Sequence, residues 1–215
     1  LDGIGLALKQ ASIDGTPLVL HSLEFSTEGL IVPKKLIPKG DFFWEAETNI
    51  SPVTNTELEG LYESAGTYCT QCEAQGFRKI TYFLDRPDIM TIFTVRIEGK
   101  EPALLSNGNL IRSGAGFAEW HDPWPKPSYL FALVAGNLVS VNDQFTTKSG
   151  RVVNLKIYVK PKDIDKCSFA MDALKRSMKW DENEYQREYD LDLFMIVAID
   201  DFNMGAMENK GLNIF

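Results

Sequence analysis

The chain has 215 residues, of which 44% are hydrophobic and 24% are charged, a composition typical of a folded globular protein. This length is sufficient for one large domain or two ordinary domains, each with its own core. The formal net charge of −8 argues against nucleic acid as a partner, because phosphate binding requires a cationic surface. No apolar run reaches the roughly 18 residues of a membrane-spanning helix, so we expect no membrane span.

Short apolar runs separated by turn-forming residues fill the first 144 residues and predict antiparallel β-sheets. The pair Asp14-Gly15 between two such runs predicts a tight hairpin. A further tight turn is predicted at 106–109, and three prolines predict a loop at 122–127. The remaining strands are predicted at 30–32, 42–44, 77–84, 92–97 and 129–134.

The pattern changes after this region. Residues 151–160 alternate between apolar and polar side chains, which predicts a strand with one solvated face. Apolar residues at helical spacing then predict a helix over 164–182, with Asp163 or Asp165 as its cap. Residues 191–199 are almost solidly apolar, which is typical of a central strand. The residues at helical spacing are Cys167, Met171, Leu174 and Met178.

Strand, helix and strand in succession mark the beginning of an α/β domain. We therefore expect a mostly β N-terminal domain at 1–144 and the first part of an α/β domain at 145–215. The chain opens on Leu1 without an initiator Met or a signal-like segment. We expect the first domain to be incomplete at its start and the second to be truncated.

Three cysteines, Cys69, Cys72 and Cys167, are too few for a disulfide framework, and their odd number suits a reducing compartment. The spacing of Cys69 and Cys72 is C-x-x-C. A redox pair requires a helix after the first cysteine, whereas a strand-like segment follows here. A zinc knuckle requires a second pair, which Cys167 alone cannot supply. We expect neither role.

The last residues of the chain carry its most specific motif. Gly205, Ala206, Met207, Glu208 and Asn209 spell GAMEN, which resembles the exopeptidase signature of the aminopeptidase N family of zinc metallopeptidases. The resemblance extends over most of the chain from about residue 55, through segments at 69–87, 104–109, 122–136, 174–181 and 189–199. It implies a saddle-like N-terminal β-domain and the truncated start of a thermolysin-like catalytic domain, ending in the GAMEN strand.

The resemblance implies that Glu208 binds the free α-amino group of a peptide. Glu73 matches the partner carboxylate that the family contributes from the β-domain, and Gln71 lies beside it. An ammonium group presents three N–H donors, so anionic acceptors in a partly dry pocket hold it well. A blocked or internal amide would leave both anions unpaired, at a cost of several kcal/mol, which would explain specificity for free N-termini.

The neighbouring residues would shape this site. Gly205 and Ala206 would offer backbone groups to an extended substrate, as in strand addition, although a Gly-Ala turn without a ligand is the alternative. Met204 matches the residue that floors the first side-chain pocket in many family members, and a core methionine is the alternative. Asn209 would shape the strand more than touch substrate. Met207 completes the motif.

Catalytic zinc in this family is held by two histidines of an H-E-x-x-H helix and a later glutamate. This chain contains only His21 and His121, and no H-E-x-x-H. We therefore expect zinc in the full-length enzyme, with ligands beyond residue 215, and no metal or catalytic residue in this segment. His121 beside Asp122 is expected to be structural. The acidic pair at 200–201 is expected to be a solvated strand end, because adjacent strand residues point to opposite faces.

The sequence thus predicts part of a hydrolase, a zinc-dependent aminopeptidase whose partners are peptides with a free N-terminus. The segment would carry substrate recognition and would be inactive alone, and its other partner would be the rest of the same polypeptide, with its catalytic and helical C-terminal domains. Thiol usage and the resemblance suggest a cytoplasmic location. The alternative is a non-catalytic β-rich module that binds peptide N-termini. An H-E-x-x-H after Phe215 would distinguish the two.

Overall fold

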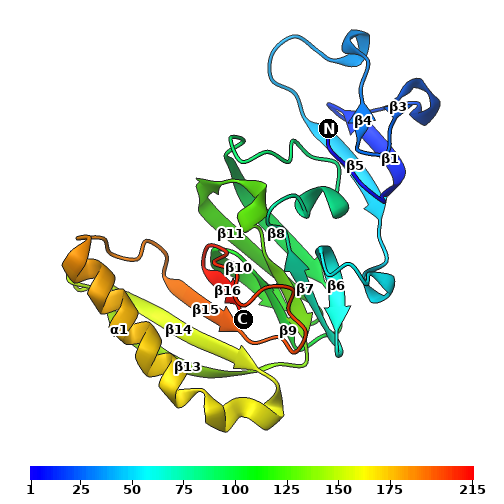
Figure 1. Cartoon of the computed structure of the whole chain (residues 1–215). Helices are drawn as coiled ribbons and strands as arrows, with labels where there is room; N and C mark the ends of the chain where they lie inside the picture. The colour runs from blue at the N-terminus through cyan, green and yellow to red at the C-terminus, as the bar shows by residue number, and fades with distance from the viewer.

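A small β-unit opens the chain in the computed structural model, which describes residues 1–215. Its three-stranded sheet has the order β2-β1-β5, and β3 pairs with β4 beside it (Figure 1). The predicted hairpin at Asp14-Gly15 is confirmed, with φ of 51° and 74° at the two residues. The strands are β1 (Ala7–Ile13), β2 (Thr16–Pro17), β3 (Glu24–Phe25), β4 (Leu30–Ile31) and β5 (Trp44–Asn49).

Two antiparallel sheets form the centre of the molecule, as the sequence predicted. One has the order β6-β7-β12-β9 and the other has the order β10-β11-β8. The predicted turn at 106–109 leads from β9 in the first sheet to β10 in the second, so it is a corner between sheets (Figure 1). The strands are β6 (Gly60–Ser64), β7 (Thr67–Gln71), β8 (Thr91–Glu98), β9 (Ala103–Ser106), β10 (Asn109–Gly114), β11 (Phe117–Lys126) and β12 (Leu133–Gly136).

The last part of the chain is a mixed four-stranded sheet with one helix. Its strand order is β13-β14-β15-β16, in which β13 and β14 are antiparallel and the other neighbours are parallel. The central position predicted for the apolar run at 191–199 is confirmed. The elements are β13 (Val139–Thr146), β14 (Val152–Val159), α1 (Ser168–Glu184), β15 (Leu193–Val197) and β16 (Leu212–Ile214). The expected domain limit at residue 144 stays a prediction, and β13 crosses it.

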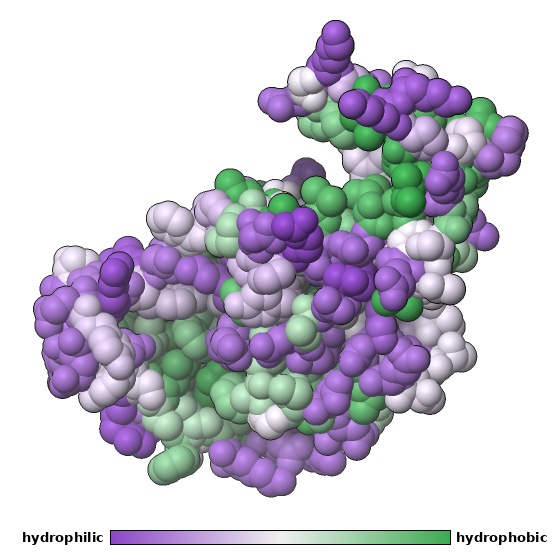
Figure 2. Space-filling view, turned by 45° about the horizontal axis from the view of Figure 1, so that its top comes forward, coloured by the Kyte–Doolittle hydropathy of each residue, from purple (hydrophilic) through white to green (hydrophobic).

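Each face of this sheet packs against a different partner. The inward residues of β14, such as Leu155 and Ile157, form one core with Met171 and Leu174 of α1. The other face packs on the central sheets, because Met195, Val197, Leu212 and Ile214 belong to the same buried cluster as Tyr62, Cys69 and Val134. The helix leaves an apolar groove of about 640 Å³ uncovered, visible as a hollow beside α1 in Figure 2.

The strand predicted at 77–84 is wrong. Residues Phe77–Lys79 form a 3-10 turn. The ring of Phe77 lies 5.0 to 5.8 Å from the rings of Phe83, Phe93 and Phe131, which draws the segment inward. The Arg78 guanidinium lies 3.0 Å from the Asp85 carboxylate, and this pair closes the loop on itself. Long-range aromatic packing therefore overrides the local strand preference of the segment.

The loop predicted at 122–127 is also wrong, because β11 continues to Lys126. Pro123 and Pro125 lie where the pairing with β8 shifts register, between Asp122 and Lys126. Pairing with β10 ends at His121, so the prolines interrupt few ladder hydrogen bonds. The sheet accommodates them as an irregularity near its end.

Other boundaries moved. The strand predicted at 129–134 begins only at Leu133, after a 3-10 turn at Ser128–Leu130. The helix begins at Ser168, four residues later than predicted, because residues Pro161–Lys166 form a 3-10 segment of their own. Neither Asp163 nor Asp165 caps the helix, since its N-cap is Cys167 and no side chain makes a capping hydrogen bond. The strand predicted at 92–97 is confirmed as β8.

No helix in the structure is both long and apolar enough to cross a membrane.

Candidate functional site

The segment that carries Gln71 and Glu73 lies at the end of a central strand. Gln71 is the last residue of β7 and is only 1% exposed. Cys72 follows in the core, and Glu73 then emerges exposed in a turn. The peptide bond between Glu73 and Ala74 is cis. The buried end of β7 thus places a carboxylate at the surface of the central sheets.

The GAMEN segment lies in the connection between β15 and β16. It is not a regular strand, because only Met207 pairs, in an isolated antiparallel bridge with Ile214. Two backbone hydrogen bonds of 2.8 and 3.0 Å close this bridge. Gly205 and Ala206 are exposed and pair with no strand, so the backbone edge expected there is free.

Burial alternates along the motif. Met207 and Asn209 are each 1% exposed, whereas Glu208 between them is exposed. The two buried neighbours anchor the chain, and the carboxylate between them is turned outward. Met204 is 49% exposed, so it is not a core methionine. The core methionine of the motif is Met207.

A contact between side chains joins the two segments. Gln71 Nε2 lies 3.8 Å from the sulfur of Met207 and 3.4 Å from the carbonyl oxygen of Glu73. Gln71 Oε1 is buried and has no hydrogen-bond partner. The fold therefore brings together two motifs that lie more than a hundred residues apart in sequence, and leaves a free acceptor between them.

The carboxylates of Glu73 and Glu208 are both exposed, and no cation of the chain forms an ion pair with either. Several other carboxylates of the chain do form ion pairs. For example, Glu57 and Glu59 both bind Lys79, and Asp190 binds Lys210. Two unpaired anions at the ends of contacting segments can accept donors from a cationic ligand.

The acidic pair at 200–201 is not a free solvated pair. Lys160 forms a hydrogen bond with Asp200 and holds the pKa of this carboxyl below its usual range. The backbone N–H of Asp201 donates to Ser64 Oγ at 3.2 Å, and Ser64 Oγ donates to Asp201 Oδ2 at 3.3 Å. Asn203 Nδ2 donates to the Leu58 carbonyl at 3.0 Å. These contacts fasten the GAMEN connection to β6 and to the residues just before it, and no local pattern indicated them.

The two cysteines of the C-x-x-C are free and fully buried. Burial raises the pKa of Cys69 to about 11, and burial also raises the pKa of Cys72. A thiol is a nucleophile only as its thiolate, so both groups are inert at neutral pH. Neither thiol is accessible, and the two do not form a disulfide, so this pair lacks the features of a redox site.

We expect that iodoacetamide at pH 8 leaves Cys69 and Cys72 unmodified in the native protein and modifies both after denaturation. Mass spectrometry of the peptides checks this, with Cys69→Ser as the control for assignment. Rapid alkylation of either thiol in the native state would contradict the burial described above.

His121 does not form a dyad with Asp122. Its Nδ1 lies 2.8 Å from Thr94 Oγ1, on the exposed side of the sheet. Asp122 is fully buried and instead binds Lys126 Nζ at 3.1 Å and accepts the Trp124 N–H at 3.1 Å. The expected structural role of His121 fits this arrangement.

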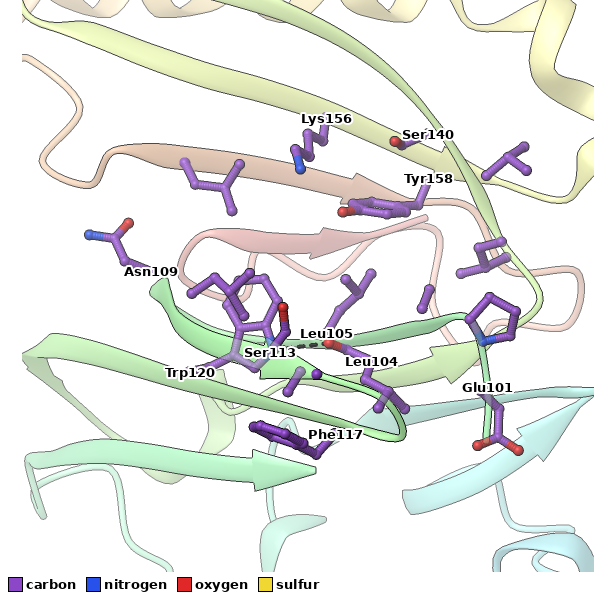
Figure 3. Close-up of a pocket in the computed structure, with 18 of the residues that line it drawn as sticks. Glu101, Leu104, Leu105, Asn109, Ser113, Phe117, Trp120, Ser140, Lys156 and Tyr158 are labelled. Atoms are coloured by element: carbon purple, nitrogen blue, oxygen red, sulfur yellow. Dashed lines mark hydrogen bonds between the residues drawn. The ribbon is translucent and has the colours of Figure 1, made fainter. Parts of the chain in front are cut away.

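The largest cavity lies away from both carboxylates. It is a cleft of about 1170 Å³ between the β10–β11 hairpin and the polar face of β14. Lys156 and Tyr158 extend into it from β14, and Trp120 and Leu104 line the opposite wall (Figure 3). None of the candidate residues at 71–73 or 204–209 lines this cleft. Size alone therefore does not identify the site.

No group of three or more His, Cys, Asp or Glu side chains in the structure could hold a metal ion. The residues of this chain therefore do not fit the zinc centre that the family resemblance implies. What the chain presents are two exposed carboxylates, Glu73 and Glu208, without ion-pair partners.

Comparison with known proteins agrees with the motifs. The family model described as "Peptidase M1 N-terminal domain" matches residues 8–130, and the model described as "Peptidase family M1 domain" matches residues 169–215. The chain belongs to peptidase family M1. The predicted membership of the aminopeptidase N family is thereby confirmed, together with the predicted fold class.

Relatives of this family match the whole chain. Aminopeptidase N of Caulobacter vibrioides is 54% identical and that of Escherichia coli is 50% identical, in each case over 100% of this chain and 25% of the relative. The crystal structure of Legionella pneumophila aminopeptidase A in complex with aspartic acid superposes with a TM-score of 0.92 at 37% identity, over 100% of this chain and 26% of that one. The chain thus spans about a quarter of the length of these relatives.

Proposed function

We propose that this chain is the substrate-recognition part of a zinc-dependent aminopeptidase that removes N-terminal residues from peptides. The observation that carries the proposal is the contact between Gln71 and Met207, because it joins the segment of Glu73 to the segment of Glu208. Membership of family M1 supports the reaction class. The family resemblance gives zinc to the full-length enzyme, with its ligands outside this chain.

Recognition follows from the chemistry of the two carboxylates. The α-ammonium of a peptide carries one positive charge and three N–H donors, and Glu73 and Glu208 together supply anionic acceptors without a competing cation. Gln71, two residues before Glu73, adds a buried acceptor without a partner, its Oε1. A peptide held by its N-terminus presents its first peptide bond at a fixed distance, so the site would select exopeptidase cleavage.

The surrounding residues would align and sort substrates. Gly205 and Ala206 have exposed backbone groups and small side chains, which allow an extended peptide to approach closely. The exposed thioether of Met204 is flexible and adapts to different first side chains, which suits broad specificity. One of the solved relatives is an aminopeptidase in complex with aspartic acid, a free amino acid that also carries a free α-amino group.

The test uses the full-length polypeptide and two peptides that differ only in N-terminal acetylation. We expect the free peptide to be shortened one residue at a time and the acetylated peptide to stay intact, as followed by mass spectrometry. A zinc chelator is expected to stop the reaction, and added zinc to restore it. Cleavage of the acetylated peptide would contradict the proposal. Binding of the free peptide without cleavage would favour a non-catalytic module.

A further inference from the structure

We infer that Asn107 is a positioning residue for Glu208, an inference that rests on the proposed function. Asn107 lies in the corner between β9 and β10, far from GAMEN in sequence, and is only 2% exposed. Its side chain reaches across to the GAMEN connection, where Nδ2 donates to the carbonyl oxygen of Lys210 at 2.8 Å. Lys210 follows Glu208 by two residues.

The amide of Asn107 is fully engaged. Besides Lys210, Nδ2 donates to the Leu130 carbonyl at 3.0 Å, and Oδ1 accepts the Ala132 N–H at 2.7 Å. Two carbonyl acceptors and one N–H donor fix which end of the amide faces which partner. One buried side chain therefore ties three segments together, namely the β9–β10 corner, the chain before β12 and the chain after Glu208.

Glu208 is held between two fixed points. On one side, Met207 is bridged to Ile214 of β16 by two backbone hydrogen bonds. On the other side, the Leu212 N–H donates to the Asn209 carbonyl at 3.0 Å and closes a turn. These bonds are internal to the second sheet and its connection. The bond from Asn107 to Lys210 ties this turn directly to the β9–β10 corner. Together with the contacts of residues 201 and 203 near β6 and the contact of Gln71 with Met207, it sets the place of the turn relative to the central sheets that carry Glu73.

Close packing fixes the β9–β10 corner that carries the donor, Asn107 Nδ2. Gly108 has a φ of +86°, and a Cβ there would lie 2.2 Å from the His121 carbonyl oxygen, so the corner presses closely on β11. Gly211 has a φ of +73°, and a Cβ there would lie 3.5 Å from the Gly108 nitrogen. The two turns are thus in contact. A side chain anchored in this corner can hold the separation of two carboxylates that follow strands of different sheets.

The experiment compares Asn107→Ala with Ser106→Ala in the full-length enzyme. Ser106 is a matched control, because it is buried beside the same corner and its Oγ donates to the Ala132 carbonyl at 2.7 Å and not to the GAMEN connection. We expect Asn107→Ala to lower kcat/KM for free-amine peptides by roughly 10-fold to 100-fold, mainly by raising KM, since misplacement of a substrate-binding group has effects of this size. Ser106→Ala should change KM by less than about twofold at a similar loss of thermal stability.

Equal effects of the two variants would overturn the inference, because both would then report only the stability of the corner. Asn107→Ser is the second variant if Asn107→Ala does not fold, since its hydroxyl can satisfy a near neighbour but is too short to reach Lys210. The same kinetic criterion applies to it.

A double-mutant cycle separates this inference from the function it rests on. If Asn107 acts through Glu208, then Asn107→Ala should add little to the loss in kcat/KM caused by Glu208→Gln. Additive losses would overturn the positioning role while the amine-binding role of Glu208 stands. If Glu208→Gln alone has no effect on free-amine peptides, the proposed function fails first, and this inference fails with it.

Discussion

Glu208→Gln in the full-length protein should lower kcat/KM for peptides with a free N-terminus by roughly 10-fold to 100-fold. The reason is that a hydrogen bond to a charged group contributes about 1.5 to 3 kcal/mol, and glutamine keeps the shape of the side chain but loses its charge. Glu208 is exposed and its neighbours provide the burial, so the substitution should leave the fold intact. Steady-state kinetics with an aminoacyl substrate measure the effect.

Two controls sharpen this result. Glu98→Gln removes an exposed carboxylate from β8, where its partner is Arg96, and should leave kcat/KM unchanged. The zinc content of Glu208→Gln should equal that of the parent enzyme, because Glu208 is proposed to bind substrate and not metal. Unchanged kinetics in Glu208→Gln, or loss of metal together with activity, would refute the assignment. Glu73→Gln should act in the same direction.

Lys126→Met should lower the free energy of unfolding of the chain by about 3 to 5 kcal/mol, the usual cost of removing one partner of a buried ion pair. Lys126 Nζ lies 3.1 Å from Asp122 Oδ2, with both side chains almost completely buried, and 4.3 Å from the centre of the Phe93 ring. Burial lowers the pKa of Lys126, while the attraction of Asp122 opposes this shift. Without the ammonium, Asp122 would be a buried anion with only the Trp124 N–H as partner.

The measurement is urea unfolding of the 215-residue chain, followed by tryptophan fluorescence. The double variant Lys126→Met with Asp122→Asn removes both charges, and should recover more than half of the lost stability. If the single variant is as stable as the parent, Lys126 does not offset the cost of burying the Asp122 carboxylate. The same conclusion follows if the double variant is less stable than the single one.

The local pattern of residues was sufficient to predict much of the fold. The hairpin at Asp14-Gly15 was predictable because a type of turn with φ above zero at both positions selects those residues. The alternation at 151–160 predicted β14 because one face packs against α1 and the other carries Asn154 and Lys156 into the open cleft. The run at 191–199 predicted a central strand because β15 is covered on both faces.

Errors arose where distant contacts decide the conformation. Residues 77–84 have the composition of a strand, but Phe77 packs in a cluster of four aromatic rings, two of which, Phe93 and Phe131, come from other segments. Prolines at 123 and 125 predicted a loop, and the irregular end of β11 tolerates them. No local pattern carries information about partners that lie tens of residues away.

The candidate site was predictable as residues but not as an arrangement. The motifs identified Glu73 and Glu208 by resemblance, whereas the contact of Gln71 with Met207 and the bond of Asn107 to Lys210 appear only in three dimensions. The signal for Asn107 was present as an Asn-Gly pair at a predicted turn. That pattern describes the turn and gives no sign that the amide reaches the end of the chain.

The buried cluster shared by the central sheets and β15–β16 limits how these two regions can be recombined between related proteins. Because Tyr62 and Val134 pack with Met195 and Leu212, the two regions cannot be exchanged separately between relatives without a mismatch in their common interior. A chimera joined near residue 144 would combine two halves of different cores. A volume change on one side of this cluster therefore requires a compensating change on the other side if the packing is to be kept.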